Sequence, residues 1–425
     1  MRPRLLVGIT ETVILYLLAI LADTQGFPMA PKSIVRRSSS LGEVQGESHY
    51  HNDINANAPW RERVRVRGGS LCAIGETTSL ETSSPKLSFG VIADIQYAPI
   101  ADGASYGGVP RYYRHALSAA RHAAEHFQKE KVDIAINLGD IVDGKCQEIE
   151  QTAETKKSNN PGIQAIRDVL SALSAYTHGE ILHTYGNHEL YNVNRNELGE
   201  LLSIPFFSEP CGEQVGYRSH LIQKDGTRLR FVILDTYDIA VGGRCETSSN
   251  KRKLAEALLF ENNPNFALGN ENSPEGIEGL ERRYVAFNGG VGEIQMQWLR
   301  DTLEASKESD EKVIVLSHQP LYPDSSNAVC LAWNYDEILD LLKQYSGTII
   351  ASFSGHAHRG GYKRCEDSGI HFRVFEAALE SPDPIKTYAL VDVYDDRIEV
   401  RGSGDCESAV YFLDHMNEMK RNVRT

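Results

Sequence analysis

From Leu87 onward, apolar runs that are typical of buried strands alternate with segments whose apolar residues recur at helical spacing. The predicted strands span 87–93, 132–138, 181–185, 229–234, 313–316 and 348–353. The predicted helices span 111–128, 163–175, 292–305 and 335–344, the third with Ile294, Trp298 and Leu299 on one face. Further antiparallel strands are predicted between 362 and 401. This order predicts an α/β protein whose sheets are covered by helices.

Three regions lack this alternation of strand-like and helix-like segments. Residues 1–84 are rich in Ser, Asn, Gly and charged residues, and predict a leader followed by a disordered linker. Residues 240–290 interrupt the ordered part and predict an insertion that caps the site. Residues 406–425 predict a C-terminal tail. One catalytic domain is therefore expected over residues 85–405.

Composition and charge narrow the class of protein. Hydrophobic residues make up 41% of the 425 residues and charged residues 24%, as in soluble globular proteins. The net charge of −14 argues against a nucleic-acid partner, which would need a basic face. Bound metal ions can reverse the local field, so a small anionic substrate remains compatible with this charge. We expect a monomer without a stable membrane span in the catalytic domain.

The cysteines and the N-terminus leave alternatives open. Seven cysteines without a C-x-x-C pair predict mostly free thiols, with one bridge such as Cys211 to Cys245 as the alternative. The apolar run over 13–22 follows two arginines and resembles a signal peptide, whereas the basic, serine-rich stretch over 32–40 resembles an organelle transit peptide. A cytoplasmic location is the alternative to both.

Five short polar blocks follow predicted strands. They begin at Asp94 (D-I-Q), Gly139 (G-D-I-V-D-G), Gly186 (G-N-H-E), Ser317 (S-H-Q-P) and Gly355 (G-H-A-H). Taken alone, each block has a bland reading as a turn, a helix cap or a hydrogen-bonded core histidine. Their common place after strand ends, where α/β folds assemble their sites, favours one shared site instead.

The five blocks resemble the signature of the calcineurin-like metallophosphoesterase superfamily, over residues 87–402. This resemblance implies a double β-sheet flanked by helices and a dinuclear metal centre. It places Asp140 on both ions, and the remaining ligands are divided between them: Asp94, Gln96 and His358 on one ion, and Asn187, His318 and His356 on the other. Gln96 stands where most members have histidine. With the motifs around Phe287 and Cys330, this departure is similar to one branch, the manganese-dependent ADP-ribose/CDP-alcohol diphosphatases.

The residue types support this chemistry. A carboxylate has two oxygens to share, so Asp140 is the best bridge between two ions. Carboxylate and amide oxygens outnumber softer donors, and no thiolate is present, which suits Mn²⁺, with Mg²⁺ as the alternative, better than Zn²⁺. A water between the two ions would be acidified into a hydroxide that attacks phosphorus.

Two further residues are candidates for catalysis. His188 follows Asn187 directly and is expected to act as general acid or to stabilise the transition state. Asp143 is expected either to orient His188 or to cap a helix.

The substrate follows from the resemblance. It implies hydrolysis of the pyrophosphate bond of ADP-ribose, and of CDP-alcohols such as CDP-choline. Residues next to the matched blocks are candidates for lining the substrate pocket, with packing or surface exposure as the alternative for each: Tyr97, Tyr191, Arg195, Phe287, Asn288 and Cys330. Another metallophosphoesterase, a phosphomonoesterase or a cyclic-nucleotide phosphodiesterase, is the alternative enzyme. A non-catalytic scaffold is disfavoured, because all seven candidate ligands are present.

Overall fold

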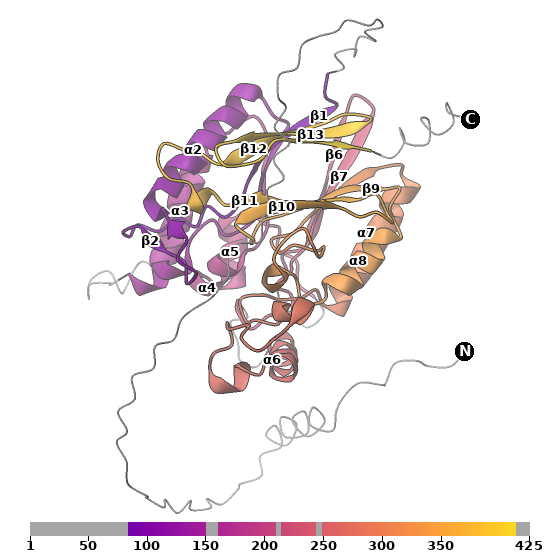
Figure 1. Ribbon diagram of the computed structural model, residues 1–425. Coiled ribbons are helices and arrows are strands. Elements are labelled where there is room, and N and C mark those ends of the chain that lie inside the picture. The colour runs from indigo at the N-terminus through magenta and orange to yellow at the C-terminus, as the bar shows by residue number, and fades with distance from the viewer. Residues whose placement is uncertain (1–83, 150–159, 210–213, 244–248, 414–425) are drawn as a thin grey trace, which may run out of the picture. The chain divides into compact units, whose positions relative to one another are not determined.

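The computed structural model describes residues 84–149, 160–209, 214–243 and 249–413. Their centre consists of two six-stranded sheets (Figure 1). The first sheet has the order β14-β13-β12-β1-β4-β5, and the second has the order β10-β11-β9-β8-β7-β6. The strands of the first sheet are β1 (Leu87–Ile92), β4 (Ile134–Asn137), β5 (Ile181–His183), β12 (Tyr388–Val393), β13 (Arg397–Ser403) and β14 (Ala409–Phe412). Those of the second are β6 (Arg218–Lys224), β7 (Thr227–Ile233), β8 (Lys312–Leu316), β9 (Ile349–Ser354), β10 (Arg359–Arg364) and β11 (His371–Glu376).

Helices cover the two outer faces, on opposite sides of the sheets (Figure 1). One pair, α2 (Tyr113–Glu130) and α3 (Pro161–Leu173), packs with strand residues of the first sheet. The other pair, α7 (Glu293–Glu308) and α8 (Tyr335–Lys343), packs with residues of the second. The predicted α/β double sheet flanked by helices is confirmed.

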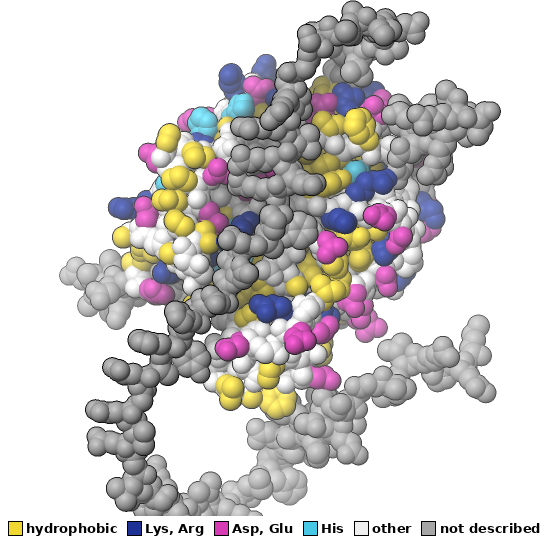
Figure 2. Space-filling model, viewed as in Figure 1, with side chains coloured by type: hydrophobic (Ala, Val, Ile, Leu, Met, Phe, Trp, Pro, Cys, Tyr) yellow, Lys and Arg dark blue, Asp and Glu magenta, His cyan; other side chains and the backbone are white. Residues whose placement is uncertain are grey.

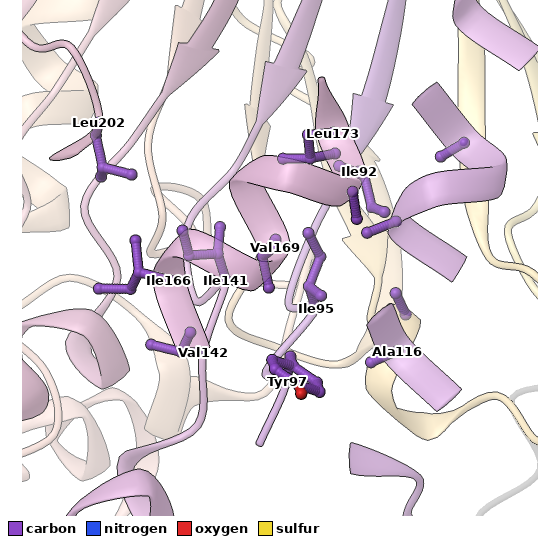
Figure 3. Packing of buried hydrophobic residues seen from close by; sticks show 14 of the residues in the cluster. Ile92, Ile95, Tyr97, Ala116, Ile141, Val142, Ile166, Val169, Leu173 and Leu202 are labelled. Carbon is purple, nitrogen blue, oxygen red and sulfur yellow. The ribbon is translucent and has the colours of Figure 1, made fainter. Parts of the chain in front are cut away.

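Apolar side chains fill the space between the sheets. Phe89 of β1 meets Phe231 of β7 edge to face, with ring centroids 5.2 Å apart, and Phe353 of β9 meets Phe375 of β11 in the same way at 5.3 Å. A second cluster joins the first sheet to α2 and α3, and it includes Ile95, Val142 and Val169 (Figure 3). Burial on both faces explains why the central strands read as continuous apolar runs.

The parallel pairing of the central strands determines where the polar blocks lie. β1 pairs in parallel with β4, and β4 with β5; β7, β8 and β9 are parallel in the same way. In each set the carboxyl ends of the strands therefore lie at one edge of the sheet. The loops that leave these ends carry the predicted blocks.

Some expectations need correction. Part of the predicted tail belongs to the first sheet, because β14 pairs with β13. Strand β6 lies at the edge of the second sheet and was not predicted, because its residues are only half buried and form no apolar run. Ile294 is 47% exposed, so the buried face of α7 passes through Gln295, Leu299 and Leu303 instead.

The predicted insertion has structure of its own. It contains α6 (Asn250–Asn262) and two short 3₁₀ segments, Phe266–Leu268 and Gly279–Arg283. Ala255 and Leu259 of α6 pack with Ile239, Ala286 and Trp333 in a small separate core. We call residues 249–290 the cap.

The surface mixes both signs of charge. On the face shown in Figure 2, Lys and Arg side chains lie among Asp and Glu side chains. Among the helices of the described ranges, none combines the length and apolar character that a bilayer crossing requires. The predicted leader, and the alternative bridge between Cys211 and Cys245, fall outside the described residues; Cys146, Cys330, Cys365 and Cys406 are free thiols.

Candidate metal centre

Asp140, His318 and His356 form the middle of the site. Their nearest ligand atoms all lie within 4.8 Å of one another. His318 Nε2 is 3.1 Å from Asp140 Oδ2 and 3.1 Å from His356 Nδ1. Asp140 and His318 are fully enclosed, although they come from loops after β4 and β8 of different sheets. The centre therefore lies where the two sheets meet.

Each histidine of the site is held by one ring nitrogen. His318 Nδ1 lies 2.7 Å from the carbonyl oxygen of Leu138, His356 Nε2 lies 2.8 Å from Asn288 Oδ1, and His358 Nδ1 lies 2.7 Å from Glu380 Oε1. Each partner atom is a hydrogen-bond acceptor, so each of these nitrogens carries the proton and donates. The other nitrogen of each ring then faces the shared centre, which is the arrangement of metal-binding histidines once that nitrogen has lost any proton to a bound cation.

The first-ion candidates surround the outer side of Asp140. Gln96 Nε2 donates to Asp140 Oδ2 at 3.1 Å and lies 3.0 Å from His358 Nε2. Asp94 Oδ1 lies 3.4 Å from His358 Nε2. The Oε1 atom of Gln96 is buried and has no hydrogen-bond partner in the described part of the chain. A buried oxygen without a partner is costly, and a cation would satisfy it.

Asn187, the second-ion candidate at the start of α4 (Asn187–Asn192), is held by tyrosines. Tyr237 donates its hydroxyl proton to Asn187 Oδ1 at 3.1 Å. Burial raises the pKa of Tyr191 above its usual value, and a hydrogen bond with the same Asn187 amide acts in the opposite direction. The preceding Gly186 must be glycine, because a Cβ atom there would lie 2.1 Å from Asp140 Oδ1.

His188 faces Asp140 from the other side. Its Nδ1 accepts the backbone N–H of Gly144 at 2.7 Å, so its proton lies on Nε2, 3.9 Å from Asp140 Oδ2. Asp143 Oδ1 caps the 3₁₀ segment Gly144–Glu148 by accepting from Lys145 N, while its Oδ2 lies 3.6 Å from His188 Nδ1 and 3.4 Å from Arg111. The capping role of Asp143 is thus present, and this cap also places the N–H that orients His188.

Charged groups of the site shift one another's pKa values. Burial alone would raise the pKa of the Asp140 carboxyl, but His318 and His188 hold it below its usual range. Burial is likewise outweighed at His318 and His358, where Asp140, Asp94 and Glu380 raise the pKa to about 10 and about 9. Burial and the charge of His318 lower the pKa of His356. Protons on these histidines balance the carboxylates, a task that divalent cations could take over.

The substrate candidates fall into two groups. Tyr191 lies against His188 and Phe287 lies against His356, with ring centroids 5.6 and 5.7 Å apart. Cys330 is half-buried, and burial together with the charge of Asp94 raises the pKa of its thiol to about 12. These three residues border the centre.

The side chains of the other three candidates are engaged in contacts within the protein. Tyr97 is 8% exposed and packs in the core beneath α2 and α3 (Figure 3). Asn288 is buried, holds His356 with Oδ1, and donates through Nδ2 to backbone carbonyls. Arg195 is buried and bound to Asp235, so for this residue the alternative of packing inside the protein holds.

Four residues that contact the centre were not among the site candidates from the sequence. Glu189 accepts the N–H groups of Asp140 and Ile141, Glu380 holds His358, Tyr237 holds Asn187, and Arg111 approaches Asp143. Of these, only Glu189 adjoins a motif, as the last residue of G-N-H-E. The others become neighbours only through the tertiary fold.

Comparison with known proteins places this centre in a family. The family model of the calcineurin-like phosphoesterases matches residues 87–360 of this chain. The chain belongs to the calcineurin-like phosphoesterase family. This membership confirms the resemblance inferred from the five blocks.

Curated relatives and a solved structure agree with this family. Proteins named manganese-dependent ADP-ribose/CDP-alcohol diphosphatase from Oryza sativa subsp. japonica and Homo sapiens are 38% and 35% identical, over 75% and 77% of this chain and 92% and 93% of theirs. The crystal structure of a dimetal phosphatase from Danio rerio is 32% identical, with a TM-score of 0.69, and covers 77% of this chain and 99% of its own.

The donor set of this phosphoesterase fits two divalent ions. Asp140 lies between two groups of side chains, with Gln96 and His358 on one side and His318 and His356 on the other. The converging histidine nitrogens and the unpartnered Gln96 oxygen are the features that cations would satisfy.

Proposed function

We propose that this phosphoesterase hydrolyses the pyrophosphate bond of ADP-ribose and CDP-alcohols in a reaction that depends on Mn²⁺. The products are AMP and ribose 5-phosphate, or CMP and a phospho-alcohol. One observation carries the proposal: ligand atoms of Asp140, His318 and His356 lie within 4.8 Å of one another, Gln96 contacts Asp140, and three histidines are each oriented by an acceptor. The names of the relatives in two plants and several vertebrates support this substrate class.

The side chains divide the chemical work. Two divalent ions, when bound, supply an acidified water and neutralise phosphate charge. Asp94, Gln96, Asp140, Asn187, His318, His356 and His358 would hold them. His188 keeps its Nε2 proton next to Asp140 because Gly144 occupies Nδ1, so it can donate a hydrogen bond to the oxygen that gains charge as the phosphoanhydride breaks.

A cavity beside the centre fits the organic part of such a substrate. Its volume is about 460 Å³, and it lies between α4 and the cap. Tyr191 and Ala286 line it, next to His188 and Phe287 of the site, and Arg252 and Phe266 of the cap line it as well. An aromatic wall with polar groups at its edge suits a nucleoside or a sugar.

The test is a comparison of substrates. ADP-ribose, CDP-choline, cyclic AMP and p-nitrophenyl phosphate are assayed side by side with Mn²⁺, and products are identified by chromatography. We expect AMP from ADP-ribose and CMP from CDP-choline, with the last two substrates turned over at least about tenfold more slowly. Preferential hydrolysis of cyclic AMP or p-nitrophenyl phosphate would overturn the proposal.

A pair of aspartate variants ties the activity to the site. Asp140→Asn removes one of the shared oxygens and should abolish turnover, because only one ion could then be held firmly. Asp395→Asn changes a carboxylate that is 79% exposed and ion-paired to Lys86, and should leave turnover unchanged. Turnover that survives in Asp140→Asn would show that the reaction occurs elsewhere.

A further inference from the structure

Arg195 is used inside the protein rather than at the substrate. It begins α5 (Arg195–Leu201), and its side chain is 5% exposed. Its guanidinium donates to Asp235 Oδ2 at 2.5 Å and to the carbonyl oxygen of Tyr237 at 2.6 Å. Because Tyr237 N also donates to Asp235 Oδ1 at 3.1 Å, the backbone of Tyr237 is fixed on both sides.

Asp235 is itself immobilised from a third element. Gln295 of α7 accepts the N–H of Asp235 at 2.9 Å and donates to its carbonyl oxygen at 3.0 Å. Gly216 N donates to Asp235 Oδ2 at 3.1 Å. Asp235, Tyr237 and Gln295 are all at most 1% exposed, so water does not compete for these bonds.

The network ends at a candidate ligand. The hydroxyl of Tyr237 donates to Asn187 Oδ1 at 3.1 Å, and its ring lies 6.0 Å from that of His318. An amide offers one oxygen that can bind a cation and one NH₂ group that cannot. A donor on Oδ1, together with Tyr191 on the same amide, fixes which end of the amide is the oxygen, and leaves the second lone pair of Oδ1 for the ion.

We infer that Tyr237 is a positioning residue for the metal ion that Asn187 binds, and that Arg195 and Asp235 hold Tyr237 in place. This inference rests on the dinuclear centre of the proposed function. Partners that orient metal ligands in this way change metal affinity by roughly 10- to 100-fold when they are removed. We expect the effect at one of the two ions, because Tyr237 bonds to Asn187 and lies against the ring of His318, and both are candidate ligands of that ion.

The experiment measures Mn²⁺ binding directly, by calorimetry and by electron paramagnetic resonance of free Mn²⁺. Tyr237→Phe removes only the hydroxyl and should weaken one of two Mn²⁺ equivalents by about tenfold or more. The matched control is Tyr185→Phe. Tyr185 is also buried, stacks 5.4 Å from the guanidinium of Arg195, and its hydroxyl has no hydrogen-bond partner in the described ranges. Its loss should leave both equivalents unchanged.

A second variant separates positioning from general damage. In Asn187→Asp, both terminal atoms are oxygens, so the side chain needs no partner to choose between them. Adding Tyr237→Phe to Asn187→Asp should therefore change Mn²⁺ affinity by less than about threefold. An equal loss in both backgrounds would assign Tyr237 a merely structural role and overturn the inference.

Failure of the positioning role of Tyr237 and failure of the Mn²⁺-dependent hydrolysis would give different results. If wild-type protein binds fewer than two Mn²⁺ ions, the dinuclear centre itself is wrong, and the inference with it. If the wild type binds two ions and hydrolyses ADP-ribose while Tyr237→Phe binds Mn²⁺ as tightly, only the positioning role is overturned. Arg195→Lys cannot make both bonds of the guanidinium and should reproduce the Tyr237→Phe result.

Discussion

Four residues at candidate ligand positions share an uncommon backbone conformation. Asp94, Gln96, Asp140 and His356 have φ values of 49°, 42°, 54° and 65°, in the left-handed region that side chains usually avoid. Such conformations cost about 1 kcal/mol or more each and persist only where the surroundings impose them. Here the Gln96 N–H donates to the Asp140 carbonyl oxygen at 2.8 Å, which locks two of these turns together. The strained turns aim side chains from separate loops at one point.

His188 should act in turnover without binding a metal ion. His188→Ala removes the Nε2 donor near Asp140, so kcat for ADP-ribose should fall by about 10²- to 10⁴-fold. Its side chain is not among the proposed ligands, so Mn²⁺ affinity should change little. Steady-state kinetics and Mn²⁺ titration on the same preparation check this. His178→Ala, at an exposed histidine, is the control, and a parallel loss of Mn²⁺ would mean that His188 is a ligand.

Gln96 should set the choice of metal. Gln96→His replaces an amide oxygen by an imidazole nitrogen, a donor that Zn²⁺ binds well, so Zn²⁺ affinity should rise by about tenfold relative to Mn²⁺. Competition between the two ions, followed by the release of bound Mn²⁺, measures the ratio. Gln297→His adds a histidine at an exposed position of α7 and should leave the ratio unaltered. An unchanged ratio in Gln96→His would remove Gln96 as the determinant.

The sequence predicted the ligand candidates but not what orients them. Asp140, Asn187 and His356 belong to short motifs in which the neighbouring glycine is itself required, as Gly186 shows. Tyr237 and Glu380 lie in no recognisable sequence motif, and they contact the site only in the folded chain. Arg195 was a pocket candidate because it is close to the G-N-H block in sequence, whereas α5 turns it toward Asp235.

At the scale of elements, the extent of burial determines which strands and helices the hydrophobic pattern of the sequence can predict. The central strands β1, β4, β8 and β9 are almost wholly buried and were predicted within a few residues. The edge strand β6 and the cap helix α6 were missed, because α6 buries only Ala255 and Leu259 and so shows no wide apolar stripe. Elements that bury little surface leave a weak signal in sequence.

The cap helix is instead attached through buried charge. Lys251 of α6 lies 2.7 Å from Glu209 Oε2 and also pairs with Asp238, and both carboxylate side chains are fully buried. Lys251→Met would leave two buried carboxylates without this cation, which should lower the free energy of unfolding by about 3 kcal/mol. Urea denaturation measures the change.

The same helix offers a control for Lys251. Lys253→Met replaces a half-buried lysine outside this ion-pair group and should alter the free energy of unfolding by less than about 0.5 kcal/mol. Limited proteolysis should cut the cap faster in Lys251→Met than in either wild type or the control. Equal stability of the two variants would show that apolar packing alone holds the cap.

At the scale of the whole molecule, the centre depends on both sheets. The first sheet supplies Asp94, Asp140 and Asn187 from loops after β1, β4 and β5, and the second supplies His318 and His356 from loops after β8 and β9. The contacts between Asp140 and His318 therefore join the two halves. A pattern of single strands cannot reveal this pairing of sheets, which the family resemblance supplied.

A buried histidine at the same junction makes stability depend on pH. His183 is the last residue of β5 in the first sheet, and its Nδ1 lies 3.1 Å from Nδ2 of Asn137. Its carbonyl oxygen accepts a hydrogen bond of 2.8 Å from Arg218 of β6 in the second sheet. Burial, assisted by the charge of Arg218, lowers the pKa of His183 to about 3. The unfolded chain takes up this proton below about pH 6.5, whereas the folded protein does not until about pH 3. The contribution of His183 to the free energy of unfolding is therefore fully present above about pH 6.5 and is lost as the pH falls toward 3.

Replacing this histidine isolates its contribution. Between pH 6.5 and 5.0, one such group should cost the wild type about 1.5 kcal/mol of unfolding free energy that His183→Gln does not lose. Urea denaturation at both pH values, with EDTA present so that metal binding does not contribute, measures the difference between the two proteins. The variant is less stable at neutral pH if the glutamine packs poorly, but that offset is the same at both pH values. Parallel pH profiles would mean that His183 gains its proton in the folded protein as easily as in the unfolded chain, and that the junction between the sheets is open to water.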